Sequence, residues 1–200
     1  LVYVTGVWLP PFFIRVHGFE LRRIGYWMEI SAALGGLGGA LGGGALASRL
    51  RRRWPLGDIW LVIVCSALCC PTLAITVLAP NPAIALTAMM AFSTLVWVWI
   101  APTSARIQRV VPVRARALAV GLMLFVSNAT ALAFGPALVG LASDALRANM
   151  GNEGLALAMA WASTAGLFSA ISYVAACLYL NRDITRTDLR SRKDGDAARG

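Results

Sequence analysis

The sequence predicts an all-α integral membrane protein. The prediction rests on five long uncharged stretches, separated by short charged or proline-rich segments. Each stretch has about the 20 residues that a helix needs to cross the hydrocarbon core of a bilayer. Inside lipid every backbone N–H and C=O must be paired within the segment, so the stretches must be helical. They cover residues 30–48, 59–79, 83–105, 117–143 and 154–181.

The composition excludes a soluble domain. Of the 200 residues, 58% are hydrophobic and only 14% are charged, which is too few charges to cover the surface of a soluble protein. Cys65, Cys69, Cys70 and Cys177 all lie in apolar stretches, and the one histidine, His17, is distant in sequence. We therefore expect buried free thiols, with no disulfide framework, metal site or cofactor.

The first apolar stretch, residues 1–14, is too short to cross the membrane and lacks the positively charged start of a signal peptide. We interpret it as the outer end of a helix whose beginning lies upstream. The chain would then hold five complete spans and part of a sixth. His17 follows this stretch, and we expect it to be a solvated loop residue rather than a proton relay.

Arginine residues are distributed unevenly between the two sides of the predicted bundle. Loops 49–58 and 106–116, with the segment 182–200, carry fourteen of the 18 Lys and Arg residues, and the alternate loops carry four. Positive residues in short loops stay cytoplasmic, which predicts a cytoplasmic C-terminus. We divide the chain into a transmembrane region, 1–181, and a disordered cytoplasmic tail, 182–200. Topology and contact with anionic lipid headgroups explain the net charge of +9, so no nucleic-acid partner is expected.

Glycines are concentrated in the 30–48 stretch. Gly35, Gly39 and Gly43 are four residues apart and share one helix face. Small residues at this spacing let two membrane helices approach backbone to backbone. Two compatible interpretations follow: a face for close helix packing, or a face along which one helix slides or rocks against its neighbour.

Few polar residues lie inside the spans. Glu29, at the outer end of the first complete span, is either a functional acid or a wetted acid near a helix N-terminus. Asn128 needs a partner near the middle of the membrane, which is either another helix or a ligand. Trp97 and Trp99, with Thr103 nearby, are two residues apart and point to different faces, so we expect at most one to line a cavity.

Residues 44–53, Gly-Ala-Leu-Ala-Ser-Arg-Leu-Arg-Arg-Arg, resemble the G-x-L-A-D-R-x-G-R-R signature of the major facilitator superfamily (MFS). In that family the signature lies between the eighth and ninth helices. Ser48 stands at the position of its acid, and Arg51 at that of its second glycine. Residues 8–18, 105–117 and 135–144 are similar to the outer end of helix seven, the loop between helices ten and eleven, and the end of helix eleven. Together these segments resemble the spinster-type branch and its bacterial relatives.

The resemblance implies the C-terminal half of a twelve-helix secondary transporter, helices seven to twelve, with its first helix incomplete. The partners would be the lipid bilayer, the missing N-terminal half and a small-molecule substrate, in a bacterial inner membrane. Substrate would bind near mid-membrane, between halves that rock about it. The candidate substrate-facing residues are Glu29, Trp97, Trp99, Thr103 and Asn128. The candidate gating or loop residues are Gly44, Ser48, Arg49, Arg52, Arg53, Arg106 and Asp144.

Two functions remain open. The first is secondary active transport of a small organic solute, coupled to protons. The second is a non-transporting membrane scaffold, or a half-transporter that needs a partner. An enzyme is not expected, because one acid within the spans and one histidine outside them form no nucleophile–base pair, metal cluster or acid pair. The sequence also lacks the Gly-rich loop with lysine that ATP-driven transport requires.

Overall fold

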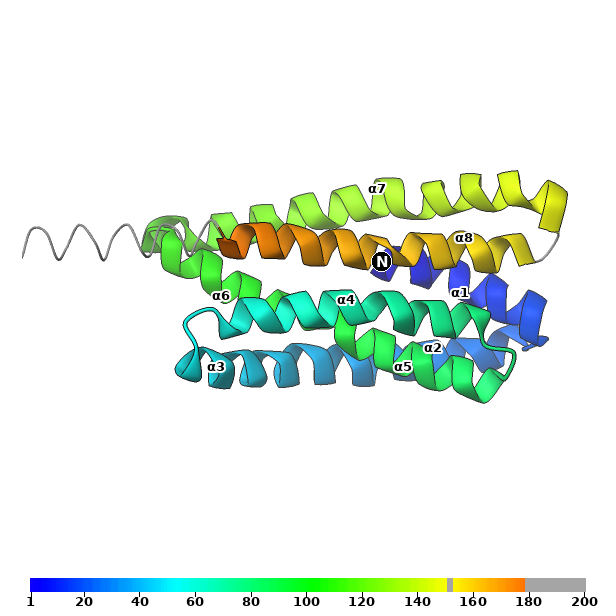
Figure 1. Cartoon of the computed structure of the whole chain (residues 1–200), viewed down its shortest axis with the longest axis horizontal. Helices are drawn as coiled ribbons and strands as arrows, with labels where there is room; N and C mark the ends of the chain where they lie inside the picture. The colour runs from blue at the N-terminus through cyan, green and yellow to red at the C-terminus, as the bar shows by residue number, and fades with distance from the viewer. Residues whose placement is uncertain (151–152, 179–200) are drawn as a thin grey trace, which may run out of the picture.

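The structure is a computed structural model that describes residues 1–150 and 153–178. In these ranges the chain forms helical rods that lie along one long axis (Figure 1). This arrangement confirms the predicted all-α class. The predicted tail, 182–200, lies outside the described residues. The helices are α1 (Val2–His17), α2 (Leu21–Leu37), α3 (Gly43–Arg53), α4 (Gly57–Leu78), α5 (Pro82–Trp97), α6 (Ile100–Val110), α7 (Arg116–Met150) and α8 (Glu153–Ser163).

Five of the described rods are long and apolar enough to cross a membrane. The first joins α2 and α3 through a π-helical turn at Gly38–Gly42, and the third joins α5 and α6. After a turn at Thr164, the α8 rod continues through residues 165–178. The five rods are Leu21–Arg53, Gly57–Leu78, Pro82–Val110, Val113–Leu146 and Gly154–Leu178.

The rods extend beyond the apolar stretches that predict them. Leu21–Arg53 has 33 residues, about 50 Å of helix at 1.5 Å per residue, against a hydrocarbon core of about 30 Å. Its charged ends therefore stay helical outside the core. The predicted loops 49–58 and 106–116 are too long for this reason, since α3 ends at Arg53 and α6 at Val110.

Local sequence explains the two turns at the end of the bundle that holds the start of α2 (Figure 1). Gly18 has a left-handed backbone, φ 65°, and the Phe19 N–H donates to the Phe13 carbonyl over 3.2 Å, which ends α1. Between α4 and α5, the Asn81 side chain accepts from the Ala83 N–H at 2.8 Å. Pro82 begins α5, where its missing N–H costs nothing.

His17 does not lie in solvent as expected. Its ring centroid is 5.6 Å from that of Phe12 and 5.4 Å from that of Phe13, and Phe19 lies on a further side. The Nε2 atom is buried and has no hydrogen-bond partner among the described residues. Burial lowers the pKa of His17 below its ordinary value, because the charged imidazolium loses water.

The glycine face of α2 lies against α5. A Cβ on Gly35 would come within 2.7 Å of the Ser93 side chain, and a Cβ on Gly39 would meet the Thr94 carbonyl oxygen. The same approach lets Ser93 Oγ donate to the Ser31 carbonyl at 2.9 Å. Only glycine allows the two backbones to come so close.

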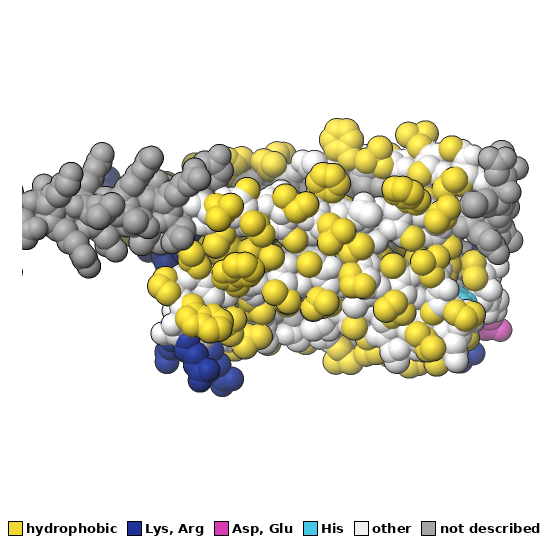
Figure 2. Space-filling view, viewed as in Figure 1, with side chains coloured by type: hydrophobic (Ala, Val, Ile, Leu, Met, Phe, Trp, Pro, Cys, Tyr) yellow, Lys and Arg dark blue, Asp and Glu magenta, His cyan; other side chains and the backbone are white. Residues whose placement is uncertain are grey.

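Apolar side chains cover the sides of the rods in the view of Figure 2, and the visible Lys and Arg side chains gather at the ends. The ends of α3 and α6 lie at one end of the bundle, and the α1–α2 turn lies at the other (Figure 1). Within the described residues, the ends of α3 and α6 with their arginines are thus separated from the α1–α2 turn with its own. Which end faces the cytoplasm stays a prediction.

We predict that Gly39→Ala destabilises the bundle. The added Cβ would collide with the Thr94 carbonyl oxygen and lie 2.9 Å from the Trp97 Cβ. Overpacking of this kind costs about 1–3 kcal/mol, which thermal unfolding of the detergent-solubilised protein would measure. Gly42→Ala is the matched control, because nothing lies within 4 Å of its added Cβ. Equal stability of the two variants would contradict the close packing of α2 on α5.

We also predict that acid weakens the α1–α2 turn through His17. Its lowered pKa means that the unfolded chain takes up a proton first, as pH falls below the ordinary value of 6.5. The stability that the neutral ring provides is present above this pH and is lost as pH falls toward the lower folded-state pKa. His17→Phe keeps an aromatic ring without a titrating group. Melting temperatures across this range should fall less steeply for the variant, and identical slopes would contradict the assignment.

Candidate functional site

A buried acid, Asp58, joins the arginine-rich helix ends of the bundle. Its side chain is fully buried in the first turn of α4. Arg106 of α6 donates to it twice, from Nε to Oδ2 at 2.8 Å and from Nη2 to Oδ1 at 2.5 Å. Arg106 Nη2 also donates to the Pro55 carbonyl at 2.6 Å. The pair therefore ties the α3–α4 turn to α6.

Two further features hold the Asp58 carboxylate in place. The Ile59 N–H donates to Oδ1 at 3.0 Å, as is favourable at a helix N-terminus. Arg51 Nη1 lies 3.8 Å from Oδ2 and adds a second, more distant positive charge. Gly57 lets α4 begin directly on α3, since a Cβ there would come within 2.7 Å of the Leu50 carbonyl oxygen. The carboxylate thus has the donors that a buried charge requires.

Arg106 was predicted to be a loop-motif residue, whereas Asp58 was not predicted to be functional. A signal was present, because Asp58 is the one acid among the four arginines of the 49–58 segment. Ser48 stands where the family signature has its acid, and its hydroxyl donates to the Ala45 carbonyl at 2.7 Å, within α3. Asp58 lies ten residues after Ser48, at the start of the next helix.

The other candidate loop residues occupy separate places. Gly44 packs on α6, where a Cβ would lie 3.2 Å from the Ala101 Cβ. Asp144 is exposed near the end of α7, far along the chain from Arg106. The remaining three arginines lie with Trp54 around a shallow concave surface at the end of α3, which we call the arginine face. It is formed by Leu46, Arg49, Leu50, Arg52, Arg53 and Trp54.

Asn128 is bonded to α1. Its Oδ1 accepts from the Tyr3 hydroxyl at 3.1 Å, in an exposed position. Tyr3 was not singled out from the sequence, because a tyrosine near the start of an apolar stretch gives no specific signal. Nearby, Trp8 Nε1 donates to the Pro136 carbonyl at 3.0 Å. These two bonds join α1 to α7.

The remaining substrate-facing candidates are not brought together. Glu29 is exposed on α2, and Thr103 bonds with the Tyr173 hydroxyl at 2.9 Å, between α6 and the α8 rod. Trp97 lines a cavity of about 130 Å³ among α1, α2 and α5, and Trp99 lines another of about 320 Å³. The expectation that at most one of these tryptophans lines a cavity is therefore wrong.

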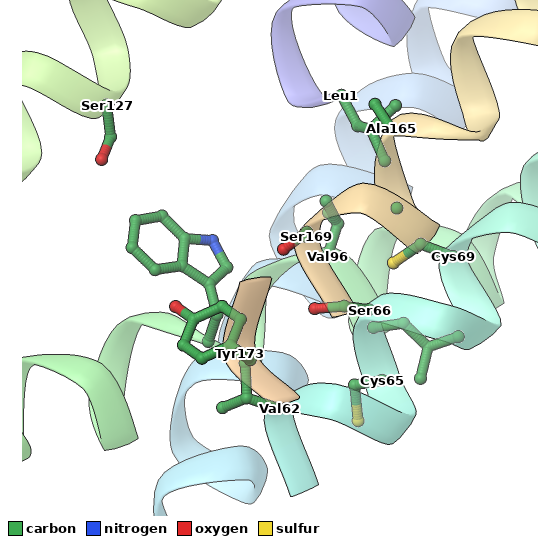
Figure 3. Close-up of a pocket in the computed structure, with 13 residues that line it drawn as sticks. Leu1, Val62, Cys65, Ser66, Cys69, Val96, Ser127, Ala165, Ser169 and Tyr173 are labelled. Carbon is green, nitrogen blue, oxygen red and sulfur yellow. The ribbon is translucent and has the colours of Figure 1, made fainter. Parts of the chain in front are cut away.

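The cavity of about 320 Å³ lies between α4, α5, α7 and the α8 rod. Figure 3 shows Ser66, Ser169 and Tyr173 around it, Ser127 across the open space on α7, and Leu1 at its upper edge. A second cavity of about 470 Å³ reaches Asp58 and Arg106, and it shares Val62 and Tyr173 with the first. The two together extend from the start of α1 toward the buried ion pair.

Comparison with known proteins gives one informative similarity. The chain is 30% identical over 185 residues to an MFS-type efflux pump of Mycolicibacterium smegmatis. The aligned part is 91% of this chain and 42% of the pump, so the chain spans less than half the length of this relative. No protein-family model matches the chain, and no solved structure matches it.

This similarity supports membership of the major facilitator superfamily, and the all-helical bundle is consistent with half of such a transporter. The membrane-spanning helices and this similarity support an integral membrane protein.

We predict that Arg106→Gln lowers the free energy of unfolding by about 3–5 kcal/mol, since it leaves a buried carboxylate without its main partner. Combining it with Asp58→Asn should recover part of this loss, because a neutral amide is less costly to bury than an unpaired charge. Chemical unfolding in detergent measures both.

Arg51→Gln is the control for the loss of one positive charge. Its 3.8 Å contact and partly exposed side chain should contribute about 1 kcal/mol or less. If Arg106→Gln and Arg51→Gln had equal effects, the buried pair would not have the special role assigned to it.

Proposed function

We propose that this chain is the C-terminal half, helices seven to twelve, of an alternating-access transporter that moves a small organic solute across a bacterial inner membrane. The observation that carries the proposal is the 30% identity to an efflux pump over 91% of the chain, in a bundle with five membrane-spanning rods. The arginine distribution supports a cytoplasmic C-terminus. The motif resemblance supports the spinster-like branch.

Helix α1 occupies only part of the bundle's length. It begins near the middle of the bundle's length and runs to the end where α2 starts (Figure 1). Leu1 lines the cavity of about 320 Å³, which opens beside the beginning of α1 (Figure 3). In this proposal the cavity is not the substrate site.

The substrate site in this proposal lies on the exposed face that a second half would cover. Helix α7 exposes large apolar side chains along its length, including Leu122, Phe125 and Phe134. The Tyr3–Asn128 hydrogen bond, which joins α1 to α7, is also exposed. An apolar wall with few polar groups suits an amphipathic or aromatic solute, for which hydrogen bonds set orientation. Glu29 is the candidate proton-coupling acid, since an exposed carboxylate within a span can gain and release a proton.

A half-transporter that needs a partner, or a scaffold, is the second candidate. It is favoured by one observation, that the chain spans 42% of the pump it resembles. Sizing the native polypeptide with a C-terminal tag separates the two. A product about twice as large supports the transporter, since MFS halves have similar lengths. A product the size of this chain supports the half-length alternative.

We predict that Glu29→Gln, in the full-length protein, abolishes ethidium transport driven by a pH gradient in proteoliposomes. Glutamine keeps the size of the side chain but cannot carry a proton. Glu20→Gln is the matched control, because Glu20 is also exposed but precedes α2. Transport by the Glu29 variant at the wild-type rate would remove Glu29 from the coupling mechanism. Absence of ethidium transport in the wild type would instead require other solutes to be screened.

A further inference from the structure

We propose that the arginine face at the end of α3 binds the headgroup of an anionic phospholipid. The six residues of this face line a hollow with a volume of about 560 Å³. Figure 2 shows dark blue Lys and Arg side chains gathered beside apolar ones at this end of the bundle. The inference does not depend on which solute is transported.

Helix geometry separates the arginines of α3 by role. Arg49 and Arg53 are four residues apart and Arg52 is three from Arg49, so they share one side of the helix. All three are exposed. Arg51 points elsewhere and lies 3.8 Å from Asp58. Among the described residues no carboxylate lies within ion-pair distance of Arg49, Arg52 or Arg53.

The apolar part of the surface selects a lipid among possible anions. Leu46 and Leu50 line it between the arginines, and Trp54 closes it with 63% of its surface exposed. Tryptophan is favoured at the headgroup level of a bilayer, where its ring is apolar and its N–H can reach polar groups. A soluble phosphate would use the guanidinium groups but leave this apolar floor in water. A phospholipid uses both, with the phosphate on arginine and the glycerol and upper acyl chain on leucine.

The position along the helix agrees with a lipid ligand. The rod Leu21–Arg53 crosses the membrane, and the arginine face is its last two turns. Arginine forms paired hydrogen bonds with phosphate oxygens, which gives orientation as well as attraction. Each arginine near an anionic membrane surface contributes about 1 kcal/mol of attraction, so several on one face discriminate strongly against zwitterionic lipid.

The test compares two double variants of the full-length protein that change the net charge equally. Arg49→Gln with Arg53→Gln removes two members of the arginine face, and Arg15→Gln with Arg22→Gln removes two arginines at the opposite end. Phosphatidylglycerol retained per protein is counted by native mass spectrometry after exchange into detergent with defined lipid. We expect roughly a thirtyfold loss of affinity in the first double variant and little change in the second. Equal loss in both would overturn the proposal.

A second readout locates the lipid and does not depend on counting. Brominated phosphatidylglycerol should quench the fluorescence of Trp54. The chain has 7 tryptophans including Trp54, so the difference between the wild type and Trp54→Phe isolates the Trp54 signal. Brominated phosphatidylcholine should quench it less. The proposal is overturned if the two lipids quench equally, or if millimolar inorganic phosphate displaces the lipid, which would indicate a site for the free anion. Absence of Trp54 quenching in the wild type would also overturn it, and would indicate that another part of the protein covers this face.

Discussion

The close approach of α2 to α5 is the contact on which the rest of the bundle depends. In lipid the hydrophobic effect does not drive helices together, so packing and interhelical hydrogen bonds must hold them. Gly35 and Gly39 allow this contact, because each leaves space that α5 fills, and Gly43 does the same for Val98 just after α5. The Ser93 hydroxyl then reaches the Ser31 carbonyl across the interface. The face is buried inside the described bundle, so a sliding motion along it would require these contacts to break.

The buried ion pair fixes the arginine-rich end of the bundle. Asp58 and Arg106 belong to segments 48 residues apart, and their bond joins the start of α4 to α6. The glycine contact and the ion pair lie in different environments. The first excludes side-chain atoms, whereas the second balances the cost of burying a charge with directed donors. The two contacts together join α2 to α5 and α4 to α6.

The number and type of the helices follow from the sequence because lipid leaves few choices for an apolar stretch of this length. The helix ends do not, since charged residues such as Arg49 and Arg52 remain helical beyond the hydrocarbon core. The partner of Arg106 could have been suspected, because Asp58 is the one acid in the arginine-rich segment 49–58. The partners of Asn128 and Thr103 could not, since tyrosines 125 and 70 residues away give no local pattern. His17 was misjudged because loop position alone does not reveal the three phenylalanines around it.

The π-helical turn at Gly38–Gly42 sets a limit on the length of the glycine run. The buried small residues Ser31, Gly35, Gly39, Gly43 and Ala47 repeat every four residues. In an α-helix such a repeat drifts about 40° around the axis at each step. The wider π turn offsets this drift, so the repeat stays against one neighbour. Loss of a single residue here would rotate everything beyond it by about 100°, turning Arg51 away from Asp58. The length of the run is therefore constrained as well as its composition.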